Sequence, residues 1–270
     1  MEKSTIVGLI LGFTALLAGM ALKGADLIGL INNPAAYMII FVGTAASICV
    51  AFPMSELKKI PKLLKIAIFG QKMIPKTEII RMFMEWATIT RREGLLALES
   101  HIDDIEEPFL RNGMRMIIDG NDQDFVHDVL MEELHSMEER HKSGALIFSQ
   151  AGMYAPTLGV LGAVVGLIAA LGNLSDINMI GHSIASAFVA TLLGIFSGYV
   201  LWHPIANKLR RYSQQEVELK TMMIEGLLSI QSGVSTIAIN QKLSVYLTPT
   251  ERAAEEEREE RARAQKTVQA

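Results

Sequence analysis

Residues 152–172 read GMYAPTLGVLGAVVGLIAALG, a run without a single charged side chain. An α-helix needs about 20 mainly apolar residues to cross the hydrocarbon core of a bilayer. Three further runs of this kind stand at 5–22, 35–52 and 184–202. Half of the 270 residues are apolar, and the mean hydropathy of +0.30 exceeds that of ordinary soluble chains. The sequence therefore predicts an all-α integral membrane protein with four transmembrane helices.

The charged residues divide the chain around these runs. We expect the first two spans in 1–53, a helical cytoplasmic domain in 54–151, the other two spans in 152–204, and cytoplasmic helices with a charged tail in 205–270. Of the 25 Lys and Arg residues, only Lys23 lies in an outer loop. Basic residues near spans are retained in the cytoplasm. Both termini and the central domain are therefore predicted to be cytoplasmic, with the chain in the inner (plasma) membrane.

Helical patterns continue outside the spans. Residues 122–150 should form a long helix that runs on into the third span, and 205–247 a long helix followed by a shorter one. Residues 55–69 carry four lysines among apolar residues. That pattern suits a basic amphipathic helix at the membrane surface, or a packed helix with a solvated basic face. The tail from Glu251 onward has no apolar core to join and is expected to be loose.

The termini and the single cysteine each lead to a further expectation. The first apolar run lacks a convincing small-residue cleavage site, and a second apolar run follows it, so it is interpreted as an uncleaved anchor. Cys49 lies inside the second span and is expected to be a buried, inert thiol.

Motifs for chemistry are scarce. Glu132-x-x-His135 and Glu138-x-x-His141 each resemble half of a carboxylate-bridged metal site. Six helical steps of about 100° turn the two pairs roughly 240° apart, so they cannot share one metal. The sequence has neither a phosphate-binding Gly-rich loop with Lys-Ser/Thr nor a nucleophile elbow. We therefore expect no enzymatic activity, no metal or organic cofactor, and no nucleic-acid partner.

Glycine and proline distinguish the third and fourth spans. Gly162-x-x-x-Gly166 and Gly194-x-x-x-Gly198 let helix backbones approach closely, and helix packing alone could account for them. A proline stands near the inner end of each span, at 156 and 204, where its missing N–H frees a carbonyl and lets the helix bend. Ion transport usually needs an ionisable group in the path, and no span carries one. If the protein conducts an ion, a partner must supply the carboxylate.

Three motifs carry a family resemblance: RREGLLALE at 91–99, QAGMYAPTLG at 150–159 and ATLLG at 190–194. Together with the order of spans, the chain resembles the MotA family of flagellar motor stators up to about residue 247. The resemblance implies a homo-oligomeric ring, a pentamer in the family, around a dimer of a single-span MotB-like partner. An aspartate of that partner would carry the ion.

The same resemblance assigns roles to individual residues. Arg91 and Glu99 match the family's rotor-contacting charges and would face the rotor protein FliG. Pro156 and Pro204 match its two functional prolines. Thr191 matches the threonine near the ion path.

The coupling ion is implied by a departure from one branch of the family. Sodium-driven relatives carry threonine just after the third-span Gly-x-x-Gly, and a Thr-Thr pair in the fourth span. Here these positions read Ala163 and Ala190-Thr191. Alanine offers no side-chain oxygen to sodium, so the resemblance implies a stator that converts proton motive force into torque, with sodium less expected. The alternative is an ExbB/TolQ-type energiser of an outer-membrane process, although such relatives usually have three spans.

Overall fold

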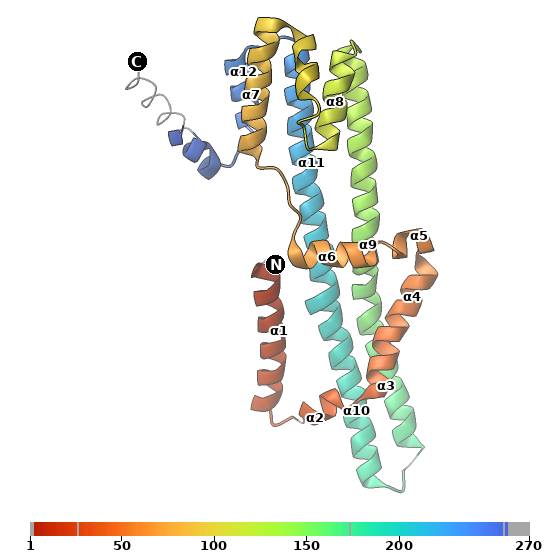
Figure 1. The fold of residues 1–270 in the computed structure, drawn as a ribbon. Coiled ribbons are helices and arrows are strands. Elements are labelled where there is room, and N and C mark those ends of the chain that lie inside the picture. The colour runs from red at the N-terminus through yellow and green to blue at the C-terminus, as the bar shows by residue number, and fades with distance from the viewer. Residues whose placement is uncertain (1–2, 26, 173, 256, 259–270) are drawn as a thin grey trace. The chain divides into compact units, whose positions relative to one another are not determined.

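The computed structural model describes residues 3–25, 27–172, 174–255 and 257–258. Every regular element within them is a helix (Figure 1), which confirms the all-α prediction. Four helices are long and apolar enough to cross a membrane, so the chain is a membrane protein. The chain forms two compact units: unit 1 comprises 1–71 and 140–213, and unit 2 comprises 72–139 and 214–270.

Unit 1 contains the apolar segments of all four membrane helices. The first is α1 (Lys3–Leu22), and the short helix α2 (Leu27–Ile31) lies between it and the second. The second is built from α3 (Pro34–Tyr37), the π-helical turn η1 (Met38–Val42) and α4 (Gly43–Ala51). The third is the later part of α9 (Gln123–Leu171). The fourth joins α10 (Ile177–Phe196), the π-helical η3 (Ser197–Trp202) and the start of α11 (His203–Gln231).

The fourth helix begins at Ile177, earlier than the expected span start at 184. Asp176 caps it: its Oδ1 accepts the backbone N–H groups of Asn178 at 3.0 Å and Met179 at 3.1 Å. An aspartate cap satisfies amides that a helix start leaves without partners. The helix therefore takes in the polar residues that separate Asp176 from the apolar run.

The basic stretch after the second span forms α5 (Met54–Leu57) and α6 (Ile60–Phe69). Figure 1 shows α6 running across α9 and α11. Its Ala67 is buried in a cluster with Ala145, Phe148, Ala206 and Leu209 of those two helices. This packing places α6 in unit 1.

Unit 2 is helical around one apolar core. Its elements are α7 (Lys76–Glu93), the 3₁₀ helix η2 (Leu95–His101), α8 (Pro108–Ile118), α12 (Thr236–Ser244) and the adjoining parts of α9 and α11. Phe83, Phe109 and Met222 are each at most 1% exposed in this core. A Cβ on Gly226 would lie 2.5 Å from the Phe83 ring, so α7 and α11 touch where α11 has no side chain.

Cys49 corrects one expectation: it is exposed, on α4. The buried residues of α4 are Thr44 and Ile48, on a different part of the helix surface. Because the run is apolar on all sides, its sequence does not indicate which side packs. Thr44 and Ile48 lie on the packed side of α4, and the Cys49 thiol lies outside that side.

The start of the tail is better anchored than expected. Thr248 caps the helical turn at 249–255: its Oγ1 accepts the N–H of Glu251 at 3.3 Å, while Glu251 accepts the Thr248 N–H at 2.8 Å. This reciprocal pair is a capping box. Arg81 Nε donates to Glu255 at 3.0 Å, and Arg252 donates to the Ser244 carbonyl at 2.7 Å. Polar contacts therefore hold the turn without an apolar core, and residues 259–270 lie outside the described residues.

The Thr248 cap predicts a pH-dependent contribution to stability. Hydrogen bonds from the Thr248 N–H and hydroxyl lower the pKa of the Glu251 carboxyl below its ordinary 4.5. A group whose pKa is lowered on folding stabilises the fold above its unfolded pKa and loses that contribution as pH falls through the folded value. Thr248→Val should therefore cost about 1 kcal/mol at neutral pH.

Amide hydrogen exchange of residues 249–255 in the full chain measures this loss. Thr248→Val should lower their protection at neutral pH, while Thr250→Val, which alters an exposed neighbour, should not. The difference should shrink well below the ordinary carboxyl pKa. Equal protection in all three proteins at neutral pH would show that the cap does not hold the turn.

Candidate functional site

The third and fourth membrane helices pack through their backbones. A Cβ built on Gly194 of α10 would lie 2.7 Å from the Ala155 carbonyl oxygen and 2.8 Å from the Gly159 Cα of α9. A Cβ on Gly159 would lie 2.9 Å from the Ala190 carbonyl oxygen. Real Cβ atoms do not come this close to backbone atoms, so only glycine fits at both positions. We name this contact the glycine seam.

The seam extends along both helices with small residues. A Cβ on Gly166 would lie 3.0 Å from the Ala187 Cβ, and one on Gly162 would lie 3.0 Å from the Ala190 Cβ. Small residues at such positions let membrane helices gain dispersion contacts where no hydrophobic driving force is available. The Gly-x-x-x-Gly pairs therefore take part in close helix packing. We call the surface that 152–172 and 184–202 form together the wall.

Pro156 belongs to this seam. It lies inside α9, which continues past it without a break, and it is half-buried. A Cβ on Gly198 would lie 2.8 Å from the Pro156 Cγ and from the Gly152 carbonyl oxygen. The ring thus fills the groove that Gly198 leaves open.

Pro204 follows a π-helical turn that sequence reasoning missed. At the end of η3, the His203 N–H bonds to the Gly198 carbonyl, five residues earlier. Pro204 comes next and has no N–H to donate. The wider i→i+5 turn thus lies directly before the residue that interrupts the helical ladder, and such π turns occur frequently at functional sites. Pro204 was the one signal for it in the sequence.

Thr191 and Ala163 lie on the two helices that form the seam, and both are half-buried. The Thr191 hydroxyl donates to the Ala187 carbonyl at 3.3 Å, within its own helix. The Thr191 Cα would lie 3.4 Å from a Cβ on Gly159, which places Thr191 at the seam. Ala163 adds no polar atom beyond its backbone.

A second contact missed from sequence ties the outer end of α10 to the start of α3. Asn33 is 6% exposed, and its Nδ2 donates to the Ser186 Oγ at 2.9 Å and to the Ser186 carbonyl at 3.2 Å. Its Oδ1 accepts the Ala36 N–H at 3.2 Å and so caps α3. The Asn-Pro sequence at 33–34 is a helix-start signal that could have suggested the cap, but nothing local points to Ser186.

The wall itself carries no charge. Residues 152–172 and 184–202 contain no Asp, Glu, Lys, Arg or His. Among the described residues, no group of His, Cys, Asp and Glu could hold a metal ion. Such a wall can position and shield an ion carrier, but proton binding requires a group from elsewhere.

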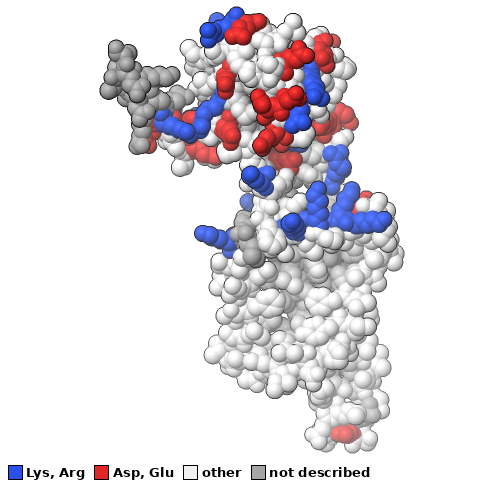
Figure 2. Space-filling view, in the orientation of Figure 1, with Lys and Arg blue, Asp and Glu red and all other residues white. Residues whose placement is uncertain are grey.

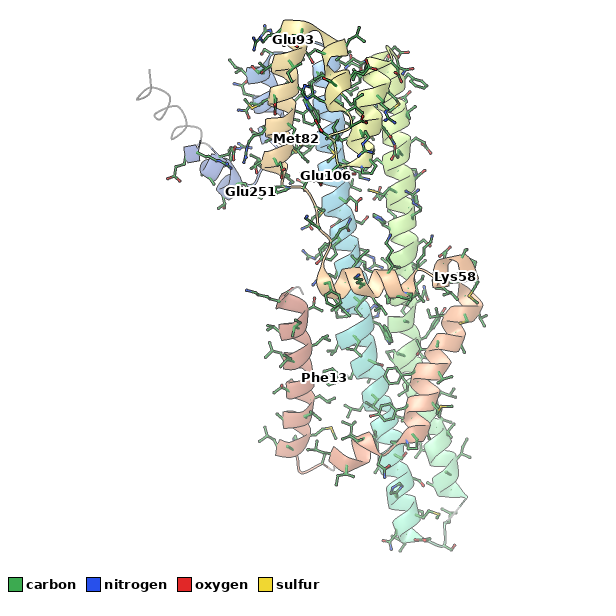
Figure 3. The ribbon with its side chains drawn as sticks, in the orientation of Figure 1. Phe13, Lys58, Met82, Glu93, Glu106 and Glu251 are labelled. Carbon is green, nitrogen blue, oxygen red and sulfur yellow. The ribbon has the colours of Figure 1, made fainter. Side chains whose placement is uncertain are left out.

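Arg91 and Glu99 lie in unit 2, on either side of a chain reversal. α7 ends at Glu93, and Gly94 follows with φ +86°, a conformation that L side chains rarely adopt. Both charges are exposed, while Leu98 between them is 1% exposed and anchors η2 to the core. Figure 3 labels Glu93, whose side chain points outward from the end of α7. Within the described chain neither Arg91 nor Glu99 forms an ion pair, so the structure displays both side chains at the surface.

The chain is similar to known proteins over most of its length. A model of the MotA/TolQ/ExbB proton channel family matches residues 101–222. The chain is 52% identical to Motility protein A of Bacillus subtilis over 93% of each chain. It is 31% identical to the chemotaxis protein PomA of Vibrio alginolyticus, covering 94% of this chain and 99% of that one.

Solved structures agree with these sequence matches. The chain superposes on a chain of the flagellar MotAB stator complex from Bacillus subtilis with a TM-score of 0.89 and 51% identity, over 94% of this chain and 99% of that one. A chain of C. jejuni MotAB matches with a TM-score of 0.87 and 32% identity, over 92% and 97%. With 52% identity to a Motility protein A over 93% of each chain, together with the family match and the shared fold, the chain belongs to the MotA/TolQ/ExbB proton channel family.

Proposed function

We propose that this chain is a stator subunit of a bacterial flagellar motor. With a MotB-like single-span partner dimer it forms a proton-conducting complex that converts proton motive force into torque on the rotor. The role is mechanical and conductive, so the chain itself catalyses no covalent reaction. The similarity to chains of two MotAB complexes supports this assignment.

The uncharged wall carries the proposal. The glycine seam fixes the third and fourth helices against each other, yet offers no group that can bind a proton. A conducting complex of this chain therefore needs a carboxylate from the partner, placed against this wall. In this proposal, Pro156, Pro204 and Thr191 respond to the change in the partner's fit that protonation of its carboxylate causes. Ala163 keeps the wall free of a further side-chain oxygen.

Assembly into a ring, a pentamer by resemblance, accounts for apolar surface that the single chain leaves open. The membrane helices α9 and α10 expose large apolar side chains, among them Val164, Ile168 and Phe188 at 46%, 64% and 72%. These residues meet lipid, the partner helices or neighbouring copies. Both termini lie in the cytoplasm, by the distribution of basic residues.

Arg91 and Glu99 contact the rotor protein FliG in this proposal. Both are exposed, and exposed ion pairs contribute little affinity, about 0–1 kcal/mol each. Their role is to orient the contact, because charge complementarity acts chiefly on steering and register.

A motility assay tests the function. The chain and a MotB-like partner are expressed in a flagellated host that lacks its own stators. Swimming should return, and it should fail when the partner's membrane aspartate is changed to asparagine. If swimming stays absent while the same pair restores an outer-membrane process in a host lacking its ExbB/TolQ-type energiser, the alternative assignment replaces this one.

Proton coupling makes a separate prediction. Swimming should persist in sodium-free medium at constant membrane potential, because Ala163 and Ala190 offer sodium no side-chain oxygen. The test measures swimming speed as the external sodium concentration is lowered, with potassium replacing sodium to keep the total cation concentration constant. A speed that falls to zero as sodium is removed would assign sodium as the coupling ion.

A further inference from the structure

Unit 1 contains a cavity to which the proposed function assigns no role. It has a volume of about 300 Å³ and lies where α6 crosses α9 and α11. That volume is at the lower end of small-ligand sites, about 300–1,000 Å³. Its charged lining residues include Lys59, Lys62 and Arg140.

The charged residues that line the cavity are all basic. In the whole of 1–71 and 140–213 the sequence places only four acids: Glu2, Asp26, Glu56 and Asp176. None of these lines the cavity, and Glu56 accepts the hydroxyl of Ser143. Figure 2 shows Lys and Arg side chains gathered in the band of unit 1 that α6 crosses, above an almost uncharged surface. An anion in the cavity would therefore meet cations without a competing carboxylate from its lining.

Hydroxyl and imidazole groups also line the cavity. Ser213 is 7% exposed, and its Oγ lies 3.2 Å from the His141 Nδ1. The Tyr212 side chain joins them in the lining. Hydroxyl and imidazole groups can donate hydrogen bonds to phosphate oxygens, and the neighbouring cations can add charge-assisted ones.

The rest of the lining is hydrocarbon. Leu63, Ile66 and Leu209 line the cavity, and all three belong to the apolar cluster through which α6 packs on α9 and α11. The apolar parts of the membrane helices begin at this level of unit 1. A ligand that matches the whole cavity thus carries a phosphate at one end and hydrocarbon at the other.

We propose that this cavity binds the headgroup of an anionic phospholipid, of the phosphatidylglycerol or cardiolipin type, with the acyl chains against the apolar lining. Basic pockets on the cytoplasmic side of membrane helices bind such headgroups. Free phosphate shares the headgroup chemistry, but it leaves Leu63, Ile66 and Leu209 uncovered. The inference does not depend on the proposed motor function.

Lipid titration of the purified full chain tests the site. The delipidated protein is titrated with dioleoylphosphatidylglycerol, and bound lipid is counted by native mass spectrometry. The triple variant K59Q/K62Q/R140Q removes the cations of the cavity. The matched control K58Q/K65Q/R211Q removes the same charge from exposed positions outside the cavity lining.

The two variants should separate clearly. K59Q/K62Q/R140Q should weaken binding by at least tenfold, and by about 100-fold if the three contributions add. The control should bind within about threefold of the wild type, because its three charges lie outside the lining of the cavity and act on a bound headgroup only through a screened field. Dioleoylphosphatidylcholine, with the same acyl chains and no net charge, should bind more weakly than the anionic lipid to the wild type and to the control, and K59Q/K62Q/R140Q should lose this preference.

Three results would overturn the proposal. Equal loss in both variants would reduce it to general attraction of the basic surface. Equal binding by all three proteins would remove the site altogether. Displacement of the lipid by millimolar inorganic phosphate would assign the cavity to free phosphate.

Discussion

Gly194→Ala is expected to abolish swimming and to destabilise the chain by about 1–3 kcal/mol. The added methyl group would stand 2.7 Å from the Ala155 carbonyl oxygen and 2.8 Å from the Gly159 Cα. Both are backbone atoms, so no side chain can turn aside, and α9 and α10 must separate. Thermal unfolding of the chain in detergent measures the stability loss independently of motility.

Gly181→Ala is the matched control. Gly181 lies on the same helix, and a Cβ there would meet nothing within 4 Å. This change should leave swimming intact and raise stability slightly, because alanine favours a helix over glycine by about 0.5–1 kcal/mol. If Gly194→Ala behaves like Gly181→Ala, the seam tolerates separation and does not fix the wall.

The charge reversal R91E/E99R should stop torque with little effect on stability. Both side chains are exposed, and neither contributes to the core of unit 2. We therefore expect non-swimming cells with a normal amount of the chain in the membrane. The measurements are rotation of tethered cells and quantification of the chain in membrane fractions.

R115E/E133R controls for charge in general. Arg115 and Glu133 lie in unit 2 and are exposed, as Arg91 and Glu99 are, and the variant likewise reverses both charges. They belong to α8 and α9, not to the segment around the Gly94 turn. Their reversal should leave rotation largely unchanged. Rotation that survives R91E/E99R at wild-type speed would move the rotor contact to another part of unit 2.

Sequence patterns predicted the helices well where composition alone decides them. The run at 152–172 and its charged continuation toward Asp122 indicated one long helix, and α9 indeed runs unbroken from Gln123 to Leu171. The break after α11 and the short α12 also agree with the expectation. Apolar length and charge segregation are properties of local sequence, so they can be read without tertiary information.

Features that depend on contacts between distant residues were less accessible. The Gly-x-x-x-Gly spacing indicated close packing but not the residues that Gly194 contacts. In the structure these are Gly159 and Ala155 of α9. The link from Asn33 to Ser186 has no local signature at all. The expectation that Cys49 is buried was wrong for a related reason, since the sequence of an all-apolar helix does not reveal which side packs against other helices.

The wall built by the glycine seam has a dielectric consequence. A carboxylate that leaves water for surroundings of low polarity pays a large penalty while it is ionised, and its pKa rises. A surface that offered positive charges would remove that penalty and let the bare anion pass. Because 152–172 and 184–202 present none, an acid moving along them travels most easily when a proton has neutralised it. In the proposed stator complex, the absence of charge on this wall would thereby link movement of the partner's acid to its protonation.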